Sequence, residues 1–467
     1  TSRGQRLLNA YYRLLGAELI FFDTLRRHAN EKFDAGLESE IASLQSFDEL
    51  SAFIHDGAPV GQIALSTYSR HVGTGLVDPG DPEVRRLIVG WVREIILAMR
   101  IANRVYSDHR VEVLFFSEVF MEEYGAFYYT ALNRNLNVIR CAGTVRDDAF
   151  IFQHRSRAHD RIHHSSVDPS TWERLMRQQD DSRIEAELIQ NFSDRYGEKW
   201  HRSKRNQPGT AVVEVESAKR QLGIRPGRKV SVIYSHILYD TLFFFGTDLF
   251  KDYAEWLVET ARAAIANPHL DWLIKVHPSN LWRGEFGTLL KGRYEEELLL
   301  ESTFGSLPPH VRIVPADTPI NPLTWFRLAD YGITVRGTSG LEMAALGKTV
   351  ITAGTGRYEG NGFTIDPPDA AAYLDLLSRL HTLPPPDADR IRLAKLYAHA
   401  IFVMKPYTLH SMTPQLRTGR RQVQASDDLI YMPAAVDGSK LPPDLARFAD
   451  WALRPGDRDL LSGPGVQ

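Results

Sequence analysis

Hydrophobic positions along the chain follow two alternating patterns. Short apolar runs rich in β-branched residues are typical of buried parallel strands, whereas apolar positions that recur every three or four residues are typical of helices. The runs that predict strands lie at 111–116, 138–141, 150–153, 229–234, 272–276, 311–314, 331–335 and 349–352. Stretches with helical spacing separate most of them. This alternation predicts an α/β protein with doubly wound parallel sheets.

The strand and helix patterns fall into two blocks, separated by a charged and polar stretch that ends near residue 209. They predict an N-terminal domain at 1–210 and a second domain at 211–405. Apolar positions from residue 4 to about 35 predict a long helix, which would form an N-terminal helical extension. The proline-rich tail, 406–467, has little pattern apart from a predicted helix at 441–453.

The stretch from Asp330 to Thr364 carries the densest set of structural signals. It predicts a strand (331–335), a turn of small residues (337–340), a helix (341–346), a strand (349–352) and a glycine-rich loop (354–362). A small-residue turn at a helix N-terminus points backbone N–H groups at one place, which suits a phosphate. Glu342 lies one helical turn further on, where a carboxylate can reach ribose hydroxyls. The alternative is a plain βαβ unit whose glycines only make tight turns.

Polar residues also stand at the carboxyl ends of three predicted strands of the second domain. They are Ser235-His236, His277-Pro278, and Arg336 with Thr338-Ser339. Because such strand ends converge on one crevice, the three sets can share a ligand. Histidine, arginine and helix N-terminal amides are donors suited to charge that grows on a departing phosphate. We therefore predict His277 and His236 as catalytic residues.

The motifs Ser-Gly-x-x-Glu, Gly-Lys-x-Val-Ile and Gly-x-x-x-Tyr-x-Gly-x-Gly-Phe-Thr, with Lys-Val-His-Pro at 275–278, resemble the donor half of two-domain glycosyltransferases of the GT-B fold. Within these, they look most like the capsule polysaccharide biosynthesis family, which includes bacterial Kdo transferases. The matching residues are Ser339, Gly340, Glu342, Gly347, Lys348, Val350, Ile351, Tyr358, Gly360, Gly362, Phe363 and Thr364. The similarity is good from about 229 to 407 and faint before that.

The resemblance implies two Rossmann-like domains that face a cleft, and a tail that crosses back to the N-terminal domain. It implies transfer of a sugar from a nucleotide donor, for example a CMP-linked acid such as Kdo, to a glycan or lipid-linked acceptor. The donor-binding residues would be Ser235, Arg336, Thr338, Ser339, Gly340, Glu342 and Tyr358. Trp272, Trp325 and Tyr358 are candidates for stacking on a sugar or base. No Asp-x-Asp motif stands at a strand exit, so we expect neither a metal nor a cofactor.

Three alternatives to transfer of a sugar stay open. Sugar-nucleotide 2-epimerases share the fold and the Ser-Gly-x-x-Glu turn, and polyol-phosphate transferases share the His-Pro strand exit. A non-catalytic nucleotide-sugar-binding partner of a synthesis complex would also keep the donor motifs.

An inverting transferase needs a base that deprotonates the acceptor hydroxyl. Glu118 follows the predicted strand 111–116 and is the candidate, with Glu122, Glu123, Asp147 and Asp148 as rivals. A retaining enzyme of this fold can act without such a base.

Composition narrows the range of partners. With 467 residues and 43% hydrophobic content, the chain can build two cores. A net charge of −3 argues against nucleic acid as a partner. Basic runs at 201–205 and 417–421 leave open a peripheral association with a membrane or an acidic glycan. One cysteine, Cys141, excludes an intrachain disulfide and fits a reducing compartment.

The apolar runs of the sequence also predict where the protein is located. Since no apolar run approaches the roughly 20 residues that span a bilayer, we expect a cytoplasmic protein, associated at most with the inner face of the membrane. The sequence does not begin with Met, so the removal of a leader peptide stays an open alternative.

Overall fold

A computed structural model describes residues 12–13, 16–28, 32–177, 181–205, 209–240, 243–281, 293–416, 429–433, 441–454 and 456–462. Its contacts divide the chain into two compact units. The first comprises Thr1–His71 and Val77–Val138, and the second comprises Val72–Leu76 and Ile139–Gln467. The predicted domain limits at 210 and 405 come from the sequence pattern alone and stay predictions.

The first unit is mainly helical. Its elements are α2 (Phe22–His28), α3 (Ala35–Ala42), α4 (Phe47–Ala52), α5 (Val60–Val72), α6 (Pro82–Asp108), β1 (Leu114–Phe116) and α7 (Glu122–Asn133). The longest helix, α6, begins at the N-cap Asp81, whose side chain accepts from the Glu83 N–H, with Pro82 in its first turn. Its buried face includes Val92, Ile95 and Ile96.

The predicted single helix from 4 to 35 is wrong in the part that the structure describes. The chain is not helical at 17–21, and α2 begins only at Phe22. Gly16 has φ +78°, a left-handed conformation that ends a helix. The apolar spacing continues through this break, which is why the pattern alone did not reveal it. Residues 1–11 lie outside the described residues.

A five-stranded sheet forms the centre of the second unit. Its strands are β4 (Val230–Tyr234), β5 (Asp271–Lys275), β6 (Val311–Val314), β7 (Tyr331–Thr334) and β8 (Thr349–Thr352). The order is β6-β5-β4-β7-β8 and every pairing is parallel. The order reverses between β4 and β7, so the carboxyl ends of β4, β5 and β7 border a topological switch point, where ligands bind in such sheets.

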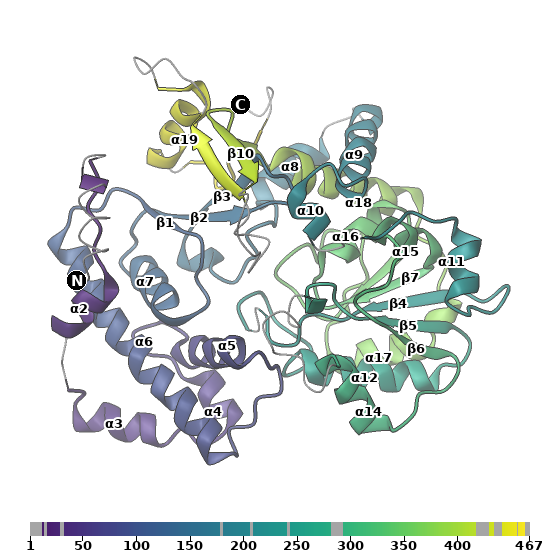
Figure 1. The fold of residues 1–467 in the computed structure, drawn as a ribbon, viewed down its shortest axis with the longest axis horizontal. Coiled ribbons are helices and arrows are strands. Elements are labelled where there is room, and N and C mark those ends of the chain that lie inside the picture. The colour runs from purple at the N-terminus through teal and green to yellow at the C-terminus, as the bar shows by residue number, and fades with distance from the viewer. Residues whose placement is uncertain are drawn as a thin grey trace. The chain divides into compact units, whose positions relative to one another are not determined.

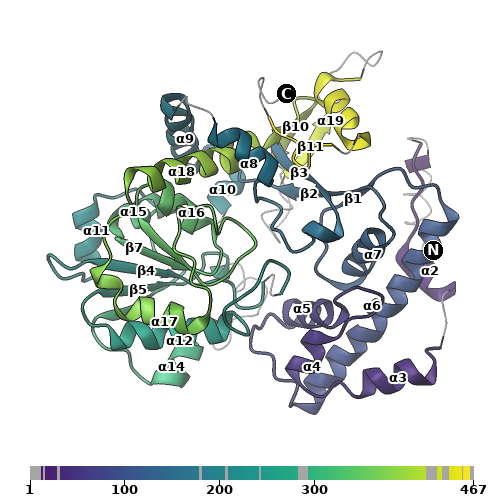
Figure 2. The same ribbon diagram turned by 180° about the vertical axis from the view of Figure 1, so that it is seen from behind.

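Helices cover both faces of this sheet (Figure 1). One face carries α11 (Val215–Gln221), α15 (Pro322–Leu328), α16 (Thr338–Ala345) and α18 (Ala388–His399); the other carries α12 (Tyr253–Ala266), α14 (Glu295–Phe304) and α17 (Ala370–Ser378). The view from behind shows the same two layers (Figure 2). The strands bury side chains on alternate faces: Val232 joins one core, and Ile233 the other.

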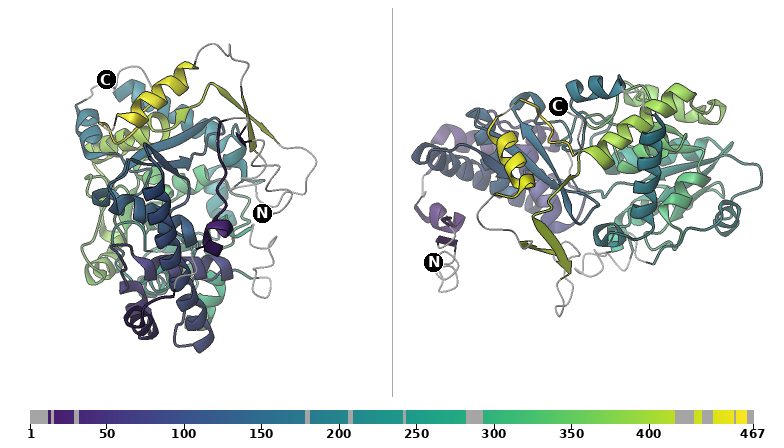
Figure 3. Two further views of the ribbon diagram at one scale, coloured as in Figure 1. Left: turned by 90° about the vertical axis from the view of Figure 1, so that its left-hand side faces the viewer. Right: turned by 90° about the horizontal axis from the view of Figure 1, so that it is seen from above.

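The second unit also contains strands β2 (Val138–Gly143) and β3 (Ala149–Arg155) and helices α8 (Pro169–Met176), α9 (Asp181–Tyr196) and α10 (His201–Arg205). The tail packs on β3. Strand β9 (Tyr407–Thr408) pairs with β3 antiparallel, and Phe152 contacts Phe448 of α19 (Pro443–Leu453) with ring centroids 4.6 Å apart. Figure 3 shows α19 as the yellow helix near the C-terminus. The tail helix predicted at 441–453 is confirmed, and a hairpin of β10 (Met412–Leu416) and β11 (Leu429–Pro433) was not predicted.

The predicted fold class is confirmed: the chain is a mixed α/β protein with a parallel, doubly wound sheet, consistent with Rossmann-like domains. Within the described residues, no helix combines the length and the apolar character that a membrane crossing needs.

Candidate functional site

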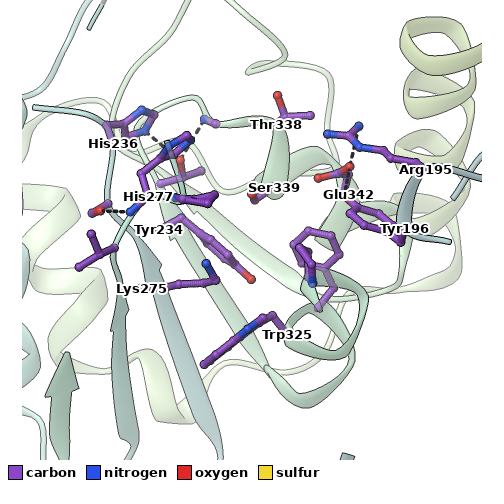
Figure 4. A pocket seen from close by; sticks show the side chains of 17 residues that line it. Arg195, Tyr196, Tyr234, His236, Lys275, His277, Trp325, Thr338, Ser339 and Glu342 are labelled. Carbon is purple, nitrogen blue, oxygen red and sulfur yellow. Dashed lines mark hydrogen bonds and ion pairs between the residues drawn. The ribbon is translucent and has the colours of Figure 1, made fainter. Parts of the chain in front are cut away.

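A pocket of about 190 Å³ opens at the carboxyl ends of β4, β5 and β7, inside the second unit (Figure 4). It is lined by Arg195, Tyr196, Tyr234, Ser235, His236, Lys275, Val276, His277, Pro278, Pro322, Trp325, Phe326, Thr334, Gly337, Thr338, Ser339 and Glu342. We call it the strand-end pocket. All three predicted sets of strand-end residues therefore contribute to one site, although Arg336 itself is not among the lining residues.

His277 follows strand β5 and contributes a hydrogen-bond donor. Its backbone N–H donates to Ser235 Oγ (3.1 Å), which ties the β5 exit to the β4 exit. Its ring Nδ1 accepts from the Ser279 N–H (3.2 Å), so the proton of the neutral ring is on Nε2. Burial, together with the charge of Lys275, lowers the pKa of His277 to about 4. At neutral pH His277 is thus an uncharged donor at the pocket wall.

His236 is oriented differently. Its Nε2 accepts from the Val335 N–H (3.1 Å) and from the Thr334 hydroxyl (3.0 Å), so Nδ1 carries the proton. The ring stacks on Tyr253 with centroids 4.5 Å apart. Burial, with the nearby Arg336 charge, holds the pKa of His236 well below its usual value. His236 therefore fixes the loop after β7 by its acceptor nitrogen while its ring borders the pocket.

Helix α16 places its N-terminus at the pocket. The Thr338 and Ser339 N–H groups have no acceptor among the described residues, and the helix dipole favours an anion there. The Thr338 hydroxyl accepts from Arg357 Nη2 (2.7 Å), which leaves its own proton to donate. Position 340, behind this turn, requires glycine because a Cβ atom there would come 2.3 Å from the Tyr358 hydroxyl.

Glu342 reaches the pocket from the same helix and is almost fully buried. Its Oε1 forms an ion pair with Arg195 Nη1 (2.8 Å) and accepts a hydrogen bond from the Tyr196 hydroxyl, both at the end of α9. Burial raises the pKa of Glu342, and the Arg195 charge opposes that rise. Oε2 has no partner among the described residues, so one carboxylate oxygen is left to accept from a ligand hydroxyl.

Three predicted donor-binding residues, Arg336, Gly340 and Tyr358, lie outside the lining. Arg336 is buried, and its guanidinium donates to the Thr355 carbonyl (2.8 Å) and pairs with Asp248. The Tyr358 hydroxyl donates to the Gly337 carbonyl (2.8 Å), so it supports the turn from behind. Of the aromatic candidates for stacking, Trp325 lines the pocket, whereas Trp272 is in the core. The donor-binding roles of Arg336 and Tyr358 stay predictions.

The predicted base Glu118 lies in the first unit, in an apolar cavity of about 430 Å³ that Phe115, Tyr124 and Phe127 also line. Its Oε1 accepts from the Val119 and Phe120 N–H groups (2.7 and 2.9 Å). Glu123 lines the same cavity, and burial raises its pKa.

The other rivals of Glu118 have structural partners. Glu122 pairs with His71. Asp147 accepts from the first N–H groups of α10, those of His201 and Arg202, and Asp148 pairs with Arg146 (2.9 Å). Which of these carboxylates acts as a base stays a prediction.

Among the lining residues that sequence reasoning gave no role are Arg195, Tyr196, Tyr234 and Lys275. Arg195 and Tyr196 end a charged helix that precedes the second block of strands, and no local motif marks them. Lys275 was visible in the motif Lys-Val-His-Pro. Because Lys275 and His277 are two positions apart on an extended chain, they project to the same side, which is a signal that could have found Lys275.

The pocket therefore offers backbone N–H groups, a neutral imidazole donor, a buried ammonium group and a carboxylate oxygen within one cavity. This set can bind an anionic group and a hydroxyl of the same ligand. Across the described residues, no three His, Cys, Asp or Glu side chains gather as metal ligands.

Neither a family model nor a curated protein sequence matches the chain. Similar solved structures include two from Thermosulfurimonas dismutans KpsC. Its β-Kdo 2,4 transferase is 14% identical, with 61% of this chain and 86% of that chain covered and a TM-score of 0.31. Its β-Kdo 2,7 transferase is 14% identical, with 66% and 82% covered and a TM-score of 0.38.

A third similar structure is the UDP-GlcNAc 2-epimerase from Neisseria meningitidis bound to UDP-GlcNAc. It is 12% identical, with 68% of this chain and 80% of that chain covered and a TM-score of 0.33. At these identities and TM-scores, the similarities decide neither the reaction nor the donor.

Proposed function

We propose that this protein is a glycosyltransferase of bacterial surface-polysaccharide assembly. It would transfer a sugar from a nucleotide donor, such as CMP-Kdo, to a glycan or lipid-linked acceptor on the cytoplasmic side of the membrane. The observation that carries the proposal is the strand-end pocket, where the N-terminus of α16, the His277 Nε2–H donor and Glu342 Oε2 line one cavity. A nucleotide has the matching groups, a phosphate and ribose hydroxyls.

In the proposed reaction, the acceptor oxygen bonds to the anomeric carbon while the bond between that carbon and the phosphate oxygen breaks, and negative charge grows on the departing phosphate. The Thr338 and Ser339 N–H groups and His277 Nε2–H stabilise that charge, and one such donor is worth about 3 kcal/mol in the transition state. His236 positions the loop that starts α16. Because His277 is neutral with a pKa of about 4, it donates a hydrogen bond without needing protonation.

The motif resemblance to Kdo transferases supports the proposed CMP-linked donor. On the acceptor side, Glu118 is the proposed base. We propose that the Glu118 carboxylate takes the proton from the acceptor hydroxyl if the transfer inverts the anomeric centre. Glu118→Gln would then lower kcat, whereas Asp147→Asn, which alters a helix cap, would mainly lower stability.

The test is a panel of CMP-, UDP- and GDP-sugars with the purified protein, scored for nucleotide binding, nucleotide release and product. Transfer or slow hydrolysis of one donor supports the proposal, and His277→Ala should abolish most of it. His269→Ala, at an exposed position near the amino end of β5, is the matched control. An absence of nucleotide binding at millimolar concentrations would refute the proposal.

Two results would replace the proposed reaction with another. UDP released together with a 2-epimerised sugar would favour an epimerase, and transfer of a phosphate-bearing group from a CDP-polyol would favour a polyol-phosphate transferase. Binding without any turnover, restored by a second protein, would favour a non-catalytic partner.

A further inference from the structure

Lys275 is a buried cation that has no counter-ion among the described residues. It ends strand β5 and is 7% exposed, and its Nζ lies 5.9 Å from the centre of the Trp325 ring (Figure 4). No carboxylate of the described residues pairs with it. Burial lowers its pKa to about 8, so it is mostly charged at neutral pH.

The charges around the pocket do not balance. Glu342 is the carboxylate among the lining residues, and Arg195 already neutralises it at 2.8 Å. His236 and His277 are uncharged at neutral pH because burial lowers both pKa values. Lys275 is therefore left without a carboxylate partner among the described lining residues, and the Arg357 guanidinium, which donates to Thr338 Oγ1 (2.7 Å), adds a further positive charge at the N-terminus of α16.

A buried ammonium group without a partner costs free energy, and proteins normally supply a counter-ion or neutralise the group. Here the cation borders a cavity, so a ligand can bring the missing charge. Nearby Asp317 lines the hollow behind Lys275 but makes no ion pair with it.

We infer that Lys275 forms an ion pair with an anionic oxygen group of the bound ligand, and that it is the residue by which the pocket selects charged nucleotides over neutral nucleosides. This inference rests on the proposed function. Lys275 ends β5 and His277 follows two positions later, about 6.6 Å away in an extended chain, so both can contact one ligand molecule. The anionic group is either a phosphate of the nucleotide or the carboxylate of an acid sugar.

The experiment compares wild type, Lys275→Met, Lys275→Arg and the control Lys219→Met by calorimetry. Lys219, on α11, pairs with Glu216 near the surface (2.9 Å), so its loss should leave binding unchanged. The probes are cytidine, CMP, CDP, the commercially available CMP-linked acid CMP-N-acetylneuraminate, and inorganic pyrophosphate. Lys275→Met should weaken binding of the anion that Lys275 contacts by roughly 10- to 100-fold, as loss of a charged hydrogen bond does. Lys275→Arg should restore part of it.

The probes separate the two sources of the anion. If Lys275→Met binds CMP more weakly than wild type does, Lys275 contacts the first phosphate; if only CDP binding is weakened, it contacts the second. If only binding of the CMP-linked acid is weakened, Lys275 contacts the carboxylate. Affinity for cytidine should not change. Equal affinities of wild type and Lys275→Met for every anionic probe would overturn the inference.

The same series separates this inference from the proposed function. Wild type could bind no nucleotide and still be stabilised by pyrophosphate, with a rise in Tm that Lys275→Met does not show. That result would refute the proposed function and support the anion contact of Lys275. If neither nucleotides nor pyrophosphate affect wild type, both fall. Lys275→Met removes an unpaired buried charge, so its Tm should not fall, and a folding defect in this variant would also contradict the inference. Lys275→Arg keeps the charge and still reports binding.

Discussion

Two buried lysines of the second unit differ in one respect. Lys405 is fully buried, and its Nζ binds Asp459 Oδ1 (2.7 Å) and the Ser166 carbonyl. Lys275 is nearly as buried and has no such partner among the described residues. Burial alone would raise the pKa of Asp459, yet Lys405 and the hydrogen-bond donors around Asp459 bring that pKa below its ordinary value. Asp459 is therefore ionised at neutral pH.

The difference separates a cation that holds the fold together from one that awaits a ligand. At Lys405 the chain supplies the counter-charge, and the pair links the end of the π-helical turn Ala400–Met404 to the tail segment 457–462. At Lys275 the chain supplies a cavity instead. Substitutions at the two lysines should therefore affect different measurements: stability at Lys405, and binding at Lys275.

The largest expected effect is on stability. Lys405→Met leaves Asp459 charged and unpaired in the interior, which should lower the free energy of unfolding by about 3–5 kcal/mol. Chemical denaturation measures this, with Lys395→Met as the control, because Lys395 pairs with Glu185 near the surface. The double variant Lys405→Met/Asp459→Leu should recover part of the loss. A Lys405→Met protein as stable as wild type would remove the contrast with Lys275.

The next effect is on turnover. His277→Ala should lower kcat by roughly 10²- to 10³-fold, like the loss of one oxyanion donor. Its Tm should stay near that of wild type, since the ring borders the pocket. Steady-state kinetics beside a thermal melt check this. A variant that loses stability but keeps the kcat of its folded fraction would show that His277 is a packing residue.

A third test uses pH to separate binding from stability at Lys275. Its pKa is about 8 when folded, against an ordinary value of 10.5. As pH rises through 8 the ammonium loses its charge, so nucleotide affinity should fall. From pH 8 to 10.5 the unfolded chain binds more protons at this residue, so its contribution to stability should rise.

Other ionisable side chains lie near the strand-end pocket. They are Tyr196, Tyr234, His236, His277, Glu342 and, behind Lys275, Asp317. For this reason, the readout is the difference between wild type and Lys275→Met in both profiles. Parallel profiles for the two proteins would contradict the assignment to Lys275.

The smallest effect concerns the ribose. Glu342→Gln keeps an acceptor for Arg195 but exchanges one carboxylate oxygen for an amide donor. Donor KM should rise about two- to tenfold, the worth of a net hydrogen bond, with kcat little changed. Wild type should also bind 2′,3′-dideoxycytidine monophosphate more weakly than CMP, and Glu342→Gln should not distinguish the two. If both proteins prefer CMP over the dideoxy nucleotide to the same degree, Glu342 does not bind the ribose.

The sheet of the second unit was predictable because each strand is a short apolar run. Val230–Tyr234, Tyr331–Thr334 and Thr349–Thr352 lie within one residue of the predicted limits. The turn before α16 was predictable as well, since its glycines are required by space: a Cβ atom at Gly337 would come 2.7 Å from Thr334 Oγ1. Strand ends then brought Ser235, His236 and His277 together by topology alone.

The electrostatics of the site could not be predicted in this way. Whether a cation has a counter-ion depends on residues far apart in sequence: Glu342 is paired by Arg195, and Arg336 by Asp248. The position of Arg336 at a strand end predicted a ligand contact, but it did not reveal that the guanidinium pairs with Asp248 within the protein. Lys275 received no role because a lysine in a strand does not reveal that it is buried and unpaired.

The tail segment 457–462 has a consequence for how the protein is made. Asp459 accepts a hydrogen bond (2.7 Å) from the side-chain amide of Gln153, which lies 306 positions earlier in the chain. The Leu460 N–H donates to the Phe152 carbonyl. A ribosome releases β3 long before it reaches these residues. Until then Gln153 and Lys405 lack their partner, so β3 cannot reach its final environment during most of translation. Such long sequence separations slow folding, and the second unit must complete this region after most of the chain has left the ribosome.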